Sequence, residues 1–353
     1  MTASPAPPAP PAPPAPPAST ASGASELSMP ERLRGWTPIR MSWRGRDPLV
    51  DWCYTQGIDF VDPFFDQSVL CCFDEPFRLL FQRHTTLDAL ADLAAARPGL
   101  MPSGLVFHTS RCGSTLVTQM LARLPSVLVM AEPGPLESVL AARSVAPDLS
   151  EDQRADWFRW MVSALGQPRR PEHVHYVIKF DAWAVLQLPF IRSLFPDTPA
   201  IFLYRDPIEV LVSQAGHRGY HMIPGCLPPE LLGLHPAEAT SMAPERYMAT
   251  VLNRLLESVV TSPEKGRPTL VHYRQLPGAV TDTIAPLFGI DLGPDGRTVV
   301  LEVADQDAKN PSLPWVDDSE DKRRRATDAL RLDVRQLVDP LYDDLERLRA
   351  AAP

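Results

Sequence analysis

Long apolar runs and clustered basic residues are both missing from this sequence. No stretch approaches the roughly eighteen uninterrupted apolar residues of a membrane helix, so we expect no membrane span. Lys and Arg number 34 against 43 Asp and Glu, which gives a formal net charge of −9. Because binding to a nucleic-acid backbone rests on clustered Lys and Arg, we expect no nucleic-acid partner. Any anion site must therefore be local.

Cysteine is scarce and shows no metal-ligand spacing. There is no C-x-x-C pair and no histidine at metal spacing, so we expect no metal site. The odd number of cysteines is typical of reduced thiols, and we expect a cytoplasmic protein. The 5 cysteines are Cys53, Cys71, Cys72, Cys112 and Cys226.

The first 25 residues differ in composition from the rest. They alternate Pro and Ala, which cannot build a packed core and favour extended polyproline II. No charged start is followed by an apolar segment, so we expect no secretory signal. Residues 1–28 are expected to form a disordered spacer tail, with a docking peptide for a proline-reading module as the alternative. We expect residues 29–99 to form an N-terminal extension packed on the core, and residues 100–350 to form the main domain.

From residue 100 onward, short apolar runs alternate with helical patterns. Runs rich in Val, Ile, Leu and aromatic residues predict strands at 104–109, 127–130, 175–180, 200–204 and 269–273. Apolar spacing predicts helices at 114–124, 151–165, 183–195, 207–217, 244–261, 277–288 and 319–349, the last broken near Pro340. Continuous apolar strands between helices are typical of a parallel sheet covered on both faces. We predict an α/β fold with three αβα layers around a central, mainly parallel sheet of about five strands.

Upstream of these runs, the pattern is less regular. Residues 60–73 predict a short apolar strand or extended segment. A helix capped by Thr85 or Thr86 is expected to follow.

The strand at 104–109 ends in the sequence SRCGST, residues 110–115, directly before a helical pattern. In α/β sheets, ligands bind beyond the carboxyl ends of the strands. Small residues there let amide hydrogens converge with the free N–H groups of the helix start, which predicts a cradle for a phosphate-like anion. The alternative is an ordinary turn with Ser114 as helix N-cap. The segment 110–115 does not match the nucleotide-triphosphate loop G-x-x-x-x-G-K-[ST], because Ser114 follows Gly113 where that loop has lysine.

The loop TSRCGSTL resembles the P-[KR]-S-G-T-T-L loop of the PAPS-dependent sulfotransferase family, where PAPS is 3′-phosphoadenosine 5′-phosphosulfate. That loop binds the 5′-phosphosulfate. The resemblance implies that PAPS is the co-substrate and that it is bound by Arg111, Cys112, Gly113, Ser114 and Thr115. Cys112 replaces the usual serine and the proline before Arg111 is missing. A cradle built from backbone amides tolerates both departures.

A second motif follows in the order that this family shows. Residues 200–214, AIFLYRDPIEVLVSQ, resemble the family's 3′-phosphate motif, in which a strand ends in R-D-P and a serine follows the arginine by eight positions. Arg205 and Ser213 match these positions. A guanidinium suits a phosphate monoester because its fork engages two oxygens at once.

Further positions match the family within roughly residues 100 to 290. YVIKFD resembles the strand whose lysine lies near the transferring group, which assigns Lys179, and LVHYRQL resembles the strand whose tyrosine approaches the adenine, which assigns Tyr273. The C-terminal R-K-G motif of the cytosolic branch is absent, and Lys309 is the nearest substitute. For DKRRR at 321–325 we expect a solvated helix face, with a phosphate contact as the alternative.

The resemblance implies metal-independent, in-line transfer of a sulfuryl group to a hydroxyl or amine acceptor. Arg111 would serve as a fixed cation on the leaving 5′-phosphate, assisted by Lys179. Glu132 matches the catalytic glutamate of branches resembling the tyrosylprotein and bacterial enzymes, and we expect burial to raise its pKa toward neutrality so that it acts as the base. The alternative is a glutamate that only opens the next helix. Histidine is the base in the cytosolic branch, so His108 is the alternative catalytic base, although its place inside the strand favours a role in orienting Arg111 or in packing. On this resemblance, residues 100–350 form the sulfotransferase catalytic domain.

The acceptor pocket is expected between residues 216–248, a Gly- and Pro-rich segment that contains His217 and His221, and the aromatic segment 48–80. Both are apolar enough to favour a small hydrophobic hydroxylated metabolite. Two other interpretations stay open. One is a P-loop-like nucleotide kinase or phosphotransferase, and the other is a catalytically inactive nucleotide-binding protein.

Overall fold

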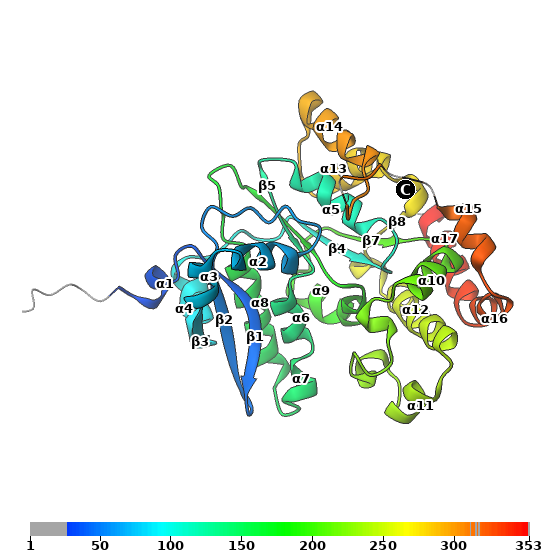
Figure 1. Cartoon of the computed structure of the whole chain (residues 1–353), viewed down its shortest axis with the longest axis horizontal. Coiled ribbons are helices and arrows are strands. Elements are labelled where there is room, and N and C mark those ends of the chain that lie inside the picture. The colour runs from blue at the N-terminus through cyan, green and yellow to red at the C-terminus, as the bar shows by residue number, and fades with distance from the viewer. Residues whose placement is uncertain (1–26, 311, 315, 317, 352–353) are drawn as a thin grey trace, which may run out of the picture.

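The computed structural model describes residues 27–310, 312–314, 316 and 318–351. The expected tail at 1–28 therefore lies almost wholly outside the described residues. A central sheet of five parallel strands has the order β5-β6-β4-β7-β8, which confirms the predicted α/β fold (Figure 1). These strands are β4 Gly104–His108, β5 Val127–Ala131, β6 His175–Lys179, β7 Ala200–Tyr204 and β8 Thr269–His272.

Side chains of successive strand residues enter two separate hydrophobic clusters. In β4, Leu105 and Phe107 lie in the larger cluster, whereas Val106 lies in the smaller one. The larger cluster is completed by helices that include α8 (Glu151–Leu165) and α12 (Pro244–Val260), and the smaller one by α5 (Ser114–Ala122) and α14 (Gly293–Glu302). Because both faces are covered, β4, β5 and β7 are buried along their whole length.

The other helices surround these layers and the N-terminal part (Figure 1). The remaining α-helices are α1 Met29–Arg32, α2 Phe65–Phe73, α3 Pro76–Leu80, α4 Asp88–Ala96, α6 Gly134–Leu140, α7 Ala142–Val145, α9 Leu188–Leu194, α10 Pro207–Gly216, α11 Pro236–Ser241, α13 Ala285–Leu287, α15 Ser319–Arg325, α16 Asp328–Asp333 and α17 Asp339–Ala351. Short 3-10 helices are η1 Ala182–Gln187, η2 Tyr220–Met222, η3 Pro229–Leu232, η4 Glu264–Gly266, η5 Tyr273–Gln275 and η7 Val303–Asp305, and π-helices are η6 Val280–Ile284 and η8 Val334–Val338. Among the described residues, no helix is both long enough and apolar enough to cross a membrane.

The N-terminal part forms an antiparallel sheet of β1 (Trp36–Arg44), β2 (Asp47–Tyr54) and β3 (Arg83–Thr86). The helix cap predicted at Thr85 or Thr86 is wrong, because both residues pair with β2 and α4 begins only after Leu87. The extended segment predicted at 60–73 is also wrong for most of its length. Its apolar positions repeat at helical spacing and are buried on one face of α2.

The C-terminal helices differ from prediction in where they break. The chain leaves the helix between α15 and α16, at residues 326–327, and not at Pro340. The π-helix η8 runs directly into α17, which carries Pro340 in its first turn. Proline has no N–H for the usual i→i−4 bond, and a wider π turn before it removes the need for that bond.

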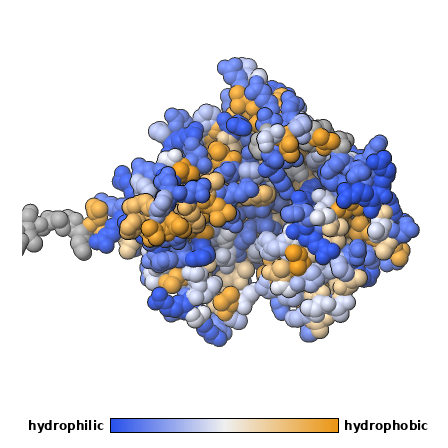
Figure 2. Space-filling model, viewed as in Figure 1, coloured by the Kyte–Doolittle hydropathy of each residue, from blue (hydrophilic) through white to orange (hydrophobic). Residues whose placement is uncertain are grey.

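Apolar side chains also gather on the surface of the N-terminal part. Figure 2 shows hydrophobic residues clustered toward the end of the molecule that carries α2 and α3. The exposed apolar residues of this region are Leu70, Phe77, Leu79, Leu80 and Phe81.

Candidate functional site

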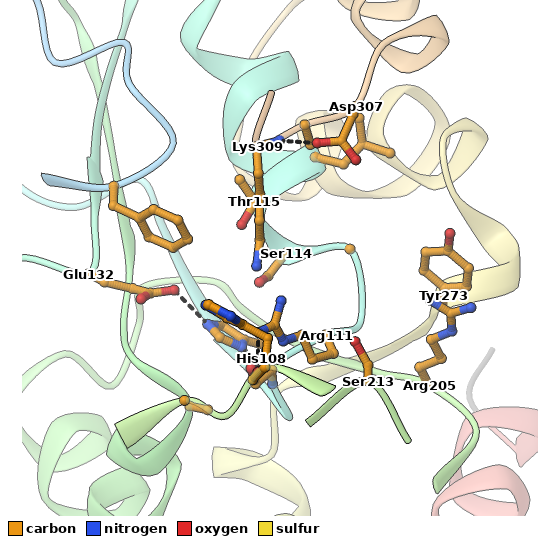
Figure 3. Close-up of a pocket in the computed structure, with 18 of the residues that line it drawn as sticks. His108, Arg111, Ser114, Thr115, Glu132, Arg205, Ser213, Tyr273, Asp307 and Lys309 are labelled. Carbon is orange, nitrogen blue, oxygen red and sulfur yellow. Dashed lines mark hydrogen bonds and ion pairs between the residues drawn. The ribbon is translucent and has the colours of Figure 1, made fainter. Parts of the chain in front are cut away.

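A cavity of ≈ 520 Å³ lies where the central strands end at their carboxyl edge (Figure 3). It brings together most of the residues singled out in the sequence. Cys112 and Lys179 are fully buried and do not line the cavity. The predicted residues that do line it are His108, Arg111, Gly113, Ser114, Thr115, Glu132, Arg205, Ser213, His217, His221, Tyr273 and Lys309.

The loop between β4 and α5 is held in a strained backbone shape. Ser110 and Arg111 have positive φ angles of 63° and 53°, a region that residues other than glycine rarely adopt. Gly113 follows with φ 85° and occupies the N-cap position of α5, so Ser114 is not the cap. No described side chain caps this helix, which leaves its first N–H groups available at the cavity. The loop thus has the form of an anion cradle.

Neighbouring strands and loops hold the cradle in place. A Cβ added at Gly113 would lie 2.6 Å from Cδ1 of Leu276, so the backbone fits there only without a side chain. The Cys112 thiol donates to the carbonyl oxygen of Leu203 over 3.3 Å and ties the loop to β7. The Arg111 guanidinium donates to the carbonyl oxygen of His217, which joins the cradle to the segment after α10.

His108 contacts both the cradle and Glu132. The Ser110 N–H donates to Nδ1 of His108 over 2.9 Å, so this nitrogen is an acceptor. The other nitrogen, Nε2, lies 3.4 Å from Oε1 of Glu132. The imidazole is only 3% exposed. It therefore connects the residue before Arg111 to the carboxylate after β5.

Glu132 and Lys179 form a buried ion pair beside the cradle. Nζ of Lys179 lies 2.8 Å from Oε1 of Glu132 and 3.4 Å from Oγ1 of Thr115. Glu132 also has a positive φ of 57°. Burial works to raise the pKa of Glu132, but the Lys179 ammonium and then His108 hold it below its usual range. The expectation of a carboxyl poised near neutral pH is therefore wrong for this form of the protein, because the ion pair outweighs burial.

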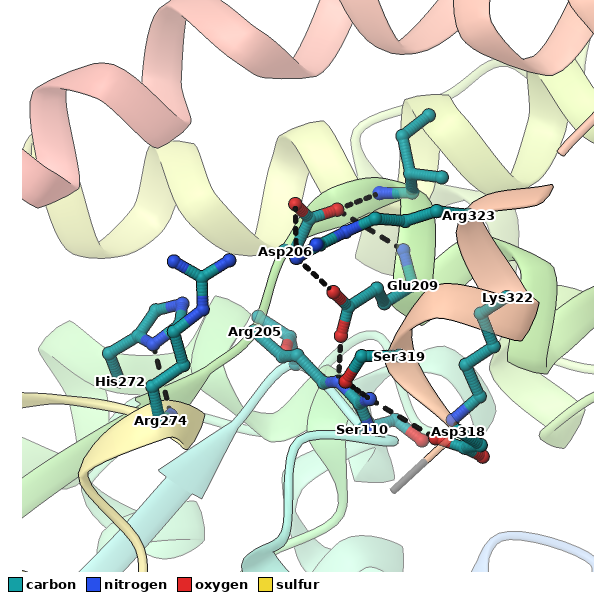
Figure 4. A network of polar contacts seen from close by, with 12 residues as sticks. Ser110, Arg205, Asp206, Glu209, His272, Arg274, Asp318, Ser319, Lys322 and Arg323 are labelled. Atoms are coloured by element: carbon teal, nitrogen blue, oxygen red, sulfur yellow. Dashed lines mark hydrogen bonds and ion pairs between the residues drawn. The ribbon is translucent and has the colours of Figure 1, made fainter.

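A second cationic centre surrounds Arg205 at the start of α10 (Figure 4). Its Nε donates to Glu209 over 2.5 Å and its Nη2 donates to Asp318 over 3.2 Å. The guanidinium lies 4.0 Å above the Tyr273 ring. Arg205 is 6% exposed, and Ser213 lines the same cavity from the next turns of α10. An anion here would compete with the two carboxylates for the guanidinium.

Helix α15 contributes to this centre, contrary to the solvated face that we expected. Lys322 is 9% exposed, lines the cavity and pairs with Asp318 over 2.7 Å. Arg323 pairs with Glu209 over 2.5 Å. Only Arg324 and Arg325 fit the expectation, since both are exposed. A run of basic residues carries no sequence signal for which of its members turns inward.

Several lining residues were not found from the sequence. Asp181 follows β6 two residues after Lys179, so its place at the end of a predicted strand could have signalled it. Phe64 and Tyr220 belong to the segments 48–80 and 216–248 expected around the acceptor, and Lys322 belongs to the basic run 321–325, but none of the three was singled out within its segment. The described residues contain no group of three or more His, Cys, Asp or Glu side chains placed to hold a metal ion.

Comparison with known proteins gives matches among solved structures only. No family model matches the chain, and no curated protein does. Three of the solved structures that it resembles are sulfotransferases. A sulfotransferase domain from the curacin biosynthetic pathway matches with a TM-score of 0.38 and 16% identity, over 71% of this chain and 97% of its own.

Two bacterial sulfotransferases match in the same way. STF9 from Mycobacterium avium has a TM-score of 0.42 and 11% identity, over 71% of this chain and 81% of its own. A sulfotransferase from Alicyclobacillus acidocaldarius has a TM-score of 0.39 and 12% identity, over 72% of this chain and 97% of its own. These are distant likenesses of fold, so the chemistry has to rest on the residues of the cavity.

Proposed function

We propose that this protein is a sulfotransferase that moves a sulfuryl group from PAPS to a hydroxyl or amine of a small-molecule acceptor, by in-line transfer without a metal. The supporting observation is that two groups of residues suited to bind anions line one cavity. One is the cradle of residues 110–115, and the other is the Arg205 cluster, which consists of Arg205, Ser213, Tyr273 and Lys322. PAPS carries phosphate at its 5′ and 3′ positions, which suits one phosphate in each site.

The residues present fit such a donor. The cradle has a glycine where a Cβ would collide, and an uncapped helix start that can donate to phosphate oxygens. The Arg205 guanidinium stacks on the Tyr273 ring. This contact holds the ring beside the proposed 3′-phosphate site, where it would contact the adenine. Arg205 donates to Asp318, and the 3′-phosphate would replace this carboxylate.

The proposed step breaks the bond between sulfur and the bridging oxygen of the 5′-phosphate while the acceptor oxygen bonds to sulfur. The acceptor proton passes to Glu132, and adenosine 3′,5′-bisphosphate leaves with the electron pair of the broken bond. Arg111 and the N-terminus of α5 stabilise the charge that grows on the leaving phosphate. Positioning and electrostatics dominate this chemistry, as in phosphoryl transfer.

Glu132 becomes a stronger base only when the charge of Lys179 is drawn elsewhere. In the free protein the 2.8 Å ion pair keeps the carboxylate charged and lowers its pKa. The same Lys179 Nζ lies 3.4 Å from Thr115 of the cradle, so a leaving phosphate bound there would compete with Glu132 for it. We propose that donor binding in this way prepares the base.

Calorimetry with adenosine 3′,5′-bisphosphate on the full chain tests the donor site. We expect binding of the bisphosphate in preference to ATP-Mg, and loss of binding when Arg111 and Arg205 are both replaced by alanine. A preference for ATP-Mg would favour a kinase or phosphotransferase. Failure to bind the bisphosphate, or binding that survives the double replacement, would overturn the proposal.

Transfer of labelled sulfate from PAPS to a panel of hydroxyl and amine acceptors tests the activity. We expect a labelled product with the intact protein. Bisphosphate binding with no transfer to any acceptor would instead support the inactive nucleotide-binding protein.

A further inference from the structure

Carboxyl groups gather around the end of the cavity beyond Glu132. We call Asp66, Glu137 and Asp181 the acidic wall. Asp181 follows β6 and lines the cavity, whereas Glu137 on α6 and the exposed Asp66 on α2 lie outside its lining. The Tyr220 hydroxyl, which also lines the cavity, donates to Oε2 of Glu137 over 3.2 Å. Three different elements thus bring carboxyl groups to the same place.

No described Lys or Arg forms an ion pair with any of the three carboxyl groups. Burial and the charge of Glu132 outweigh the charges of His108 and Lys179, which act on Asp181 in the opposite direction. His221 also contacts the wall, since its Nδ1 lies 3.5 Å from Oδ1 of Asp181. Burial, and then the neighbouring His108, lower the pKa of His221 to about 4. The imidazole is therefore neutral near pH 7 and does not neutralise Asp181.

Buried polar atoms at this end also lack hydrogen-bond partners. His221 is 3% exposed and lines the cavity, yet neither of its ring nitrogens has a hydrogen-bond partner among the described residues. Oε1 of Glu137 is likewise buried and has no hydrogen-bond partner among the described residues. Buried polar groups are normally satisfied, and a ligand that donates hydrogen bonds would satisfy Oε1 of Glu137 and the acceptor nitrogen of His221. This observation is independent of the charge on the wall.

The pKa values of the three wall carboxyl groups are raised, as expected where carboxyl groups lie together with too little positive charge. Burial, followed by the charge of Glu132, raises the pKa of Asp181 to about 7. Burial and then Asp181 raise the pKa of Glu137 well above its usual range, and burial and Glu132 raise that of Asp66. Protons take the place that a ligand cation would otherwise fill.

We propose that the sulfate acceptor carries a protonated amine, and that its ammonium group binds at the acidic wall while its nucleophilic hydroxyl faces Glu132 and Arg111. This rests on the proposed sulfotransferase function. An ammonium donates to Asp181, Glu137 and the neutral His221, and the Tyr220 ring offers it a cation-binding face. The cavity is then bipolar, since the anionic donor lies among Arg111, Arg205 and Lys322 and the cationic acceptor lies at the opposite end.

Three phenols of similar size and shape but different charge test whether the site prefers a cationic acceptor. Tyramine carries an ammonium near pH 7, 4-ethylphenol is neutral and 4-hydroxyphenylacetate is an anion. On the full chain saturated with adenosine 3′,5′-bisphosphate, we expect calorimetry to give tyramine an affinity about tenfold or more above that of 4-ethylphenol, with the anion weakest. Tyramine binding at pH 7 should also release protons, detected as a dependence of the heat on the buffer.

Two shape-conserving variants locate the effect. Glu137→Gln and Asp181→Asn should each reduce the preference for tyramine over 4-ethylphenol at least severalfold, while Glu238→Gln, at an exposed carboxylate on α11, should leave it unchanged. Equal affinity for the three phenols, absence of tyramine binding, or a preference that survives both wall variants would overturn the inference.

The bisphosphate titration of the same samples keeps the two proposals apart. If the chain binds the bisphosphate but shows no preference for tyramine over 4-ethylphenol, the sulfotransferase proposal stands and this inference fails. Tyramine preference in a chain that does not bind bisphosphate removes the sulfotransferase proposal and retains the cationic ligand.

Discussion

At the scale of single residues, backbone strain marks the proposed site. The residues other than glycine with positive φ in the described chain are Ser110, Arg111 and Glu132. All three line the cavity. Each costs on the order of 1–3 kcal/mol, so the surrounding hydrogen bonds and the ion pair must hold them in place. Strain that gathers at one cavity is the expected sign of a preorganised site.

Gly113→Ala should destroy the cradle. The new Cβ meets Leu276 at 2.6 Å and Tyr273 at 3.0 Å in a left-handed conformation, so the loop must shift. We expect bisphosphate affinity to fall by about tenfold or more, measured by calorimetry. Gly45→Ala is the matched control, because Gly45 has φ 63° with no atom within 4 Å of an added Cβ. It should cost about 1–2 kcal/mol of stability and no affinity. Equal affinity losses in both variants would contradict the cradle.

Glu132→Gln should lower the free energy of unfolding by about 3 kcal/mol near neutral pH, because it leaves the buried Lys179 ammonium without its carboxylate. The double variant Glu132→Gln, Lys179→Met should recover most of this loss. Urea unfolding of the single and double variants measures both values. A single variant as stable as the parent would show that the ion pair contributes nothing.

The pH dependence of that difference follows from the lowered pKa of Glu132. A carboxyl whose pKa is lower in the folded than in the unfolded state adds stability above the unfolded value, about 4.3, and loses it as the pH falls toward the folded value. Below about pH 5 the stability gap between parent and Glu132→Gln should shrink. Between about pH 9 and 6.5 the gap also includes His108, because hydrogen bonds to Cys112 and Glu132 outweigh burial and raise its pKa to about 9. A gap that stays constant or grows below pH 5 would contradict the assignment.

At the scale of elements, the central strands and most of the helices between them were predictable, and the N-terminal sheet and the orientation of α15 were not. The parallel strands are continuous apolar runs, a pattern set by burial on both faces, and both motifs follow such runs directly. The hairpin β1–β2 was not predicted because charged residues, such as Arg40 in β1 and Asp51 in β2, interrupt the apolar runs of its strands. The role of α15 was not predicted, because only the tertiary fold directs Lys322 toward the cavity while Arg324 stays exposed to solvent.

Asp318, the residue before α15, should weaken nucleotide binding. It bonds to Arg205 over 3.2 Å and to Lys322 over 2.7 Å, two cations proposed for the 3′-phosphate. Asp318→Asn removes this competing charge, so we expect bisphosphate affinity to rise by about threefold to tenfold, measured by calorimetry. Asp321→Asn on the same helix is the control, since Asp321 pairs only with the exposed Arg324 and Arg325. Unchanged or weaker binding in the Asp318 variant would place the 3′-phosphate elsewhere.

At the scale of the whole molecule, one hydrophobic cluster joins the N-terminal sheet to the central sheet. Trp52 of β2 and Phe107 of β4 both belong to it, and both are fully buried. The hairpin strand β1 also contacts α6 and α8, which cover the same face of the central sheet. We therefore expect residues 29–99 and the donor site to lose their structure together.

Trp52→Ala tests this cooperativity. The indole is 0% exposed and its Nε1 donates to Thr85 over 2.8 Å, so its removal leaves a cavity and an unpaired hydroxyl. We expect a loss of about 3–5 kcal/mol in the free energy of unfolding. Urea unfolding followed by circular dichroism and by bisphosphate binding should shift by the same amount, because the shared cluster couples the two regions. Leu80→Ala, at a side chain 74% exposed, should shift neither signal. If circular dichroism moved while bisphosphate binding kept its midpoint, the N-terminal part would be an independent unit.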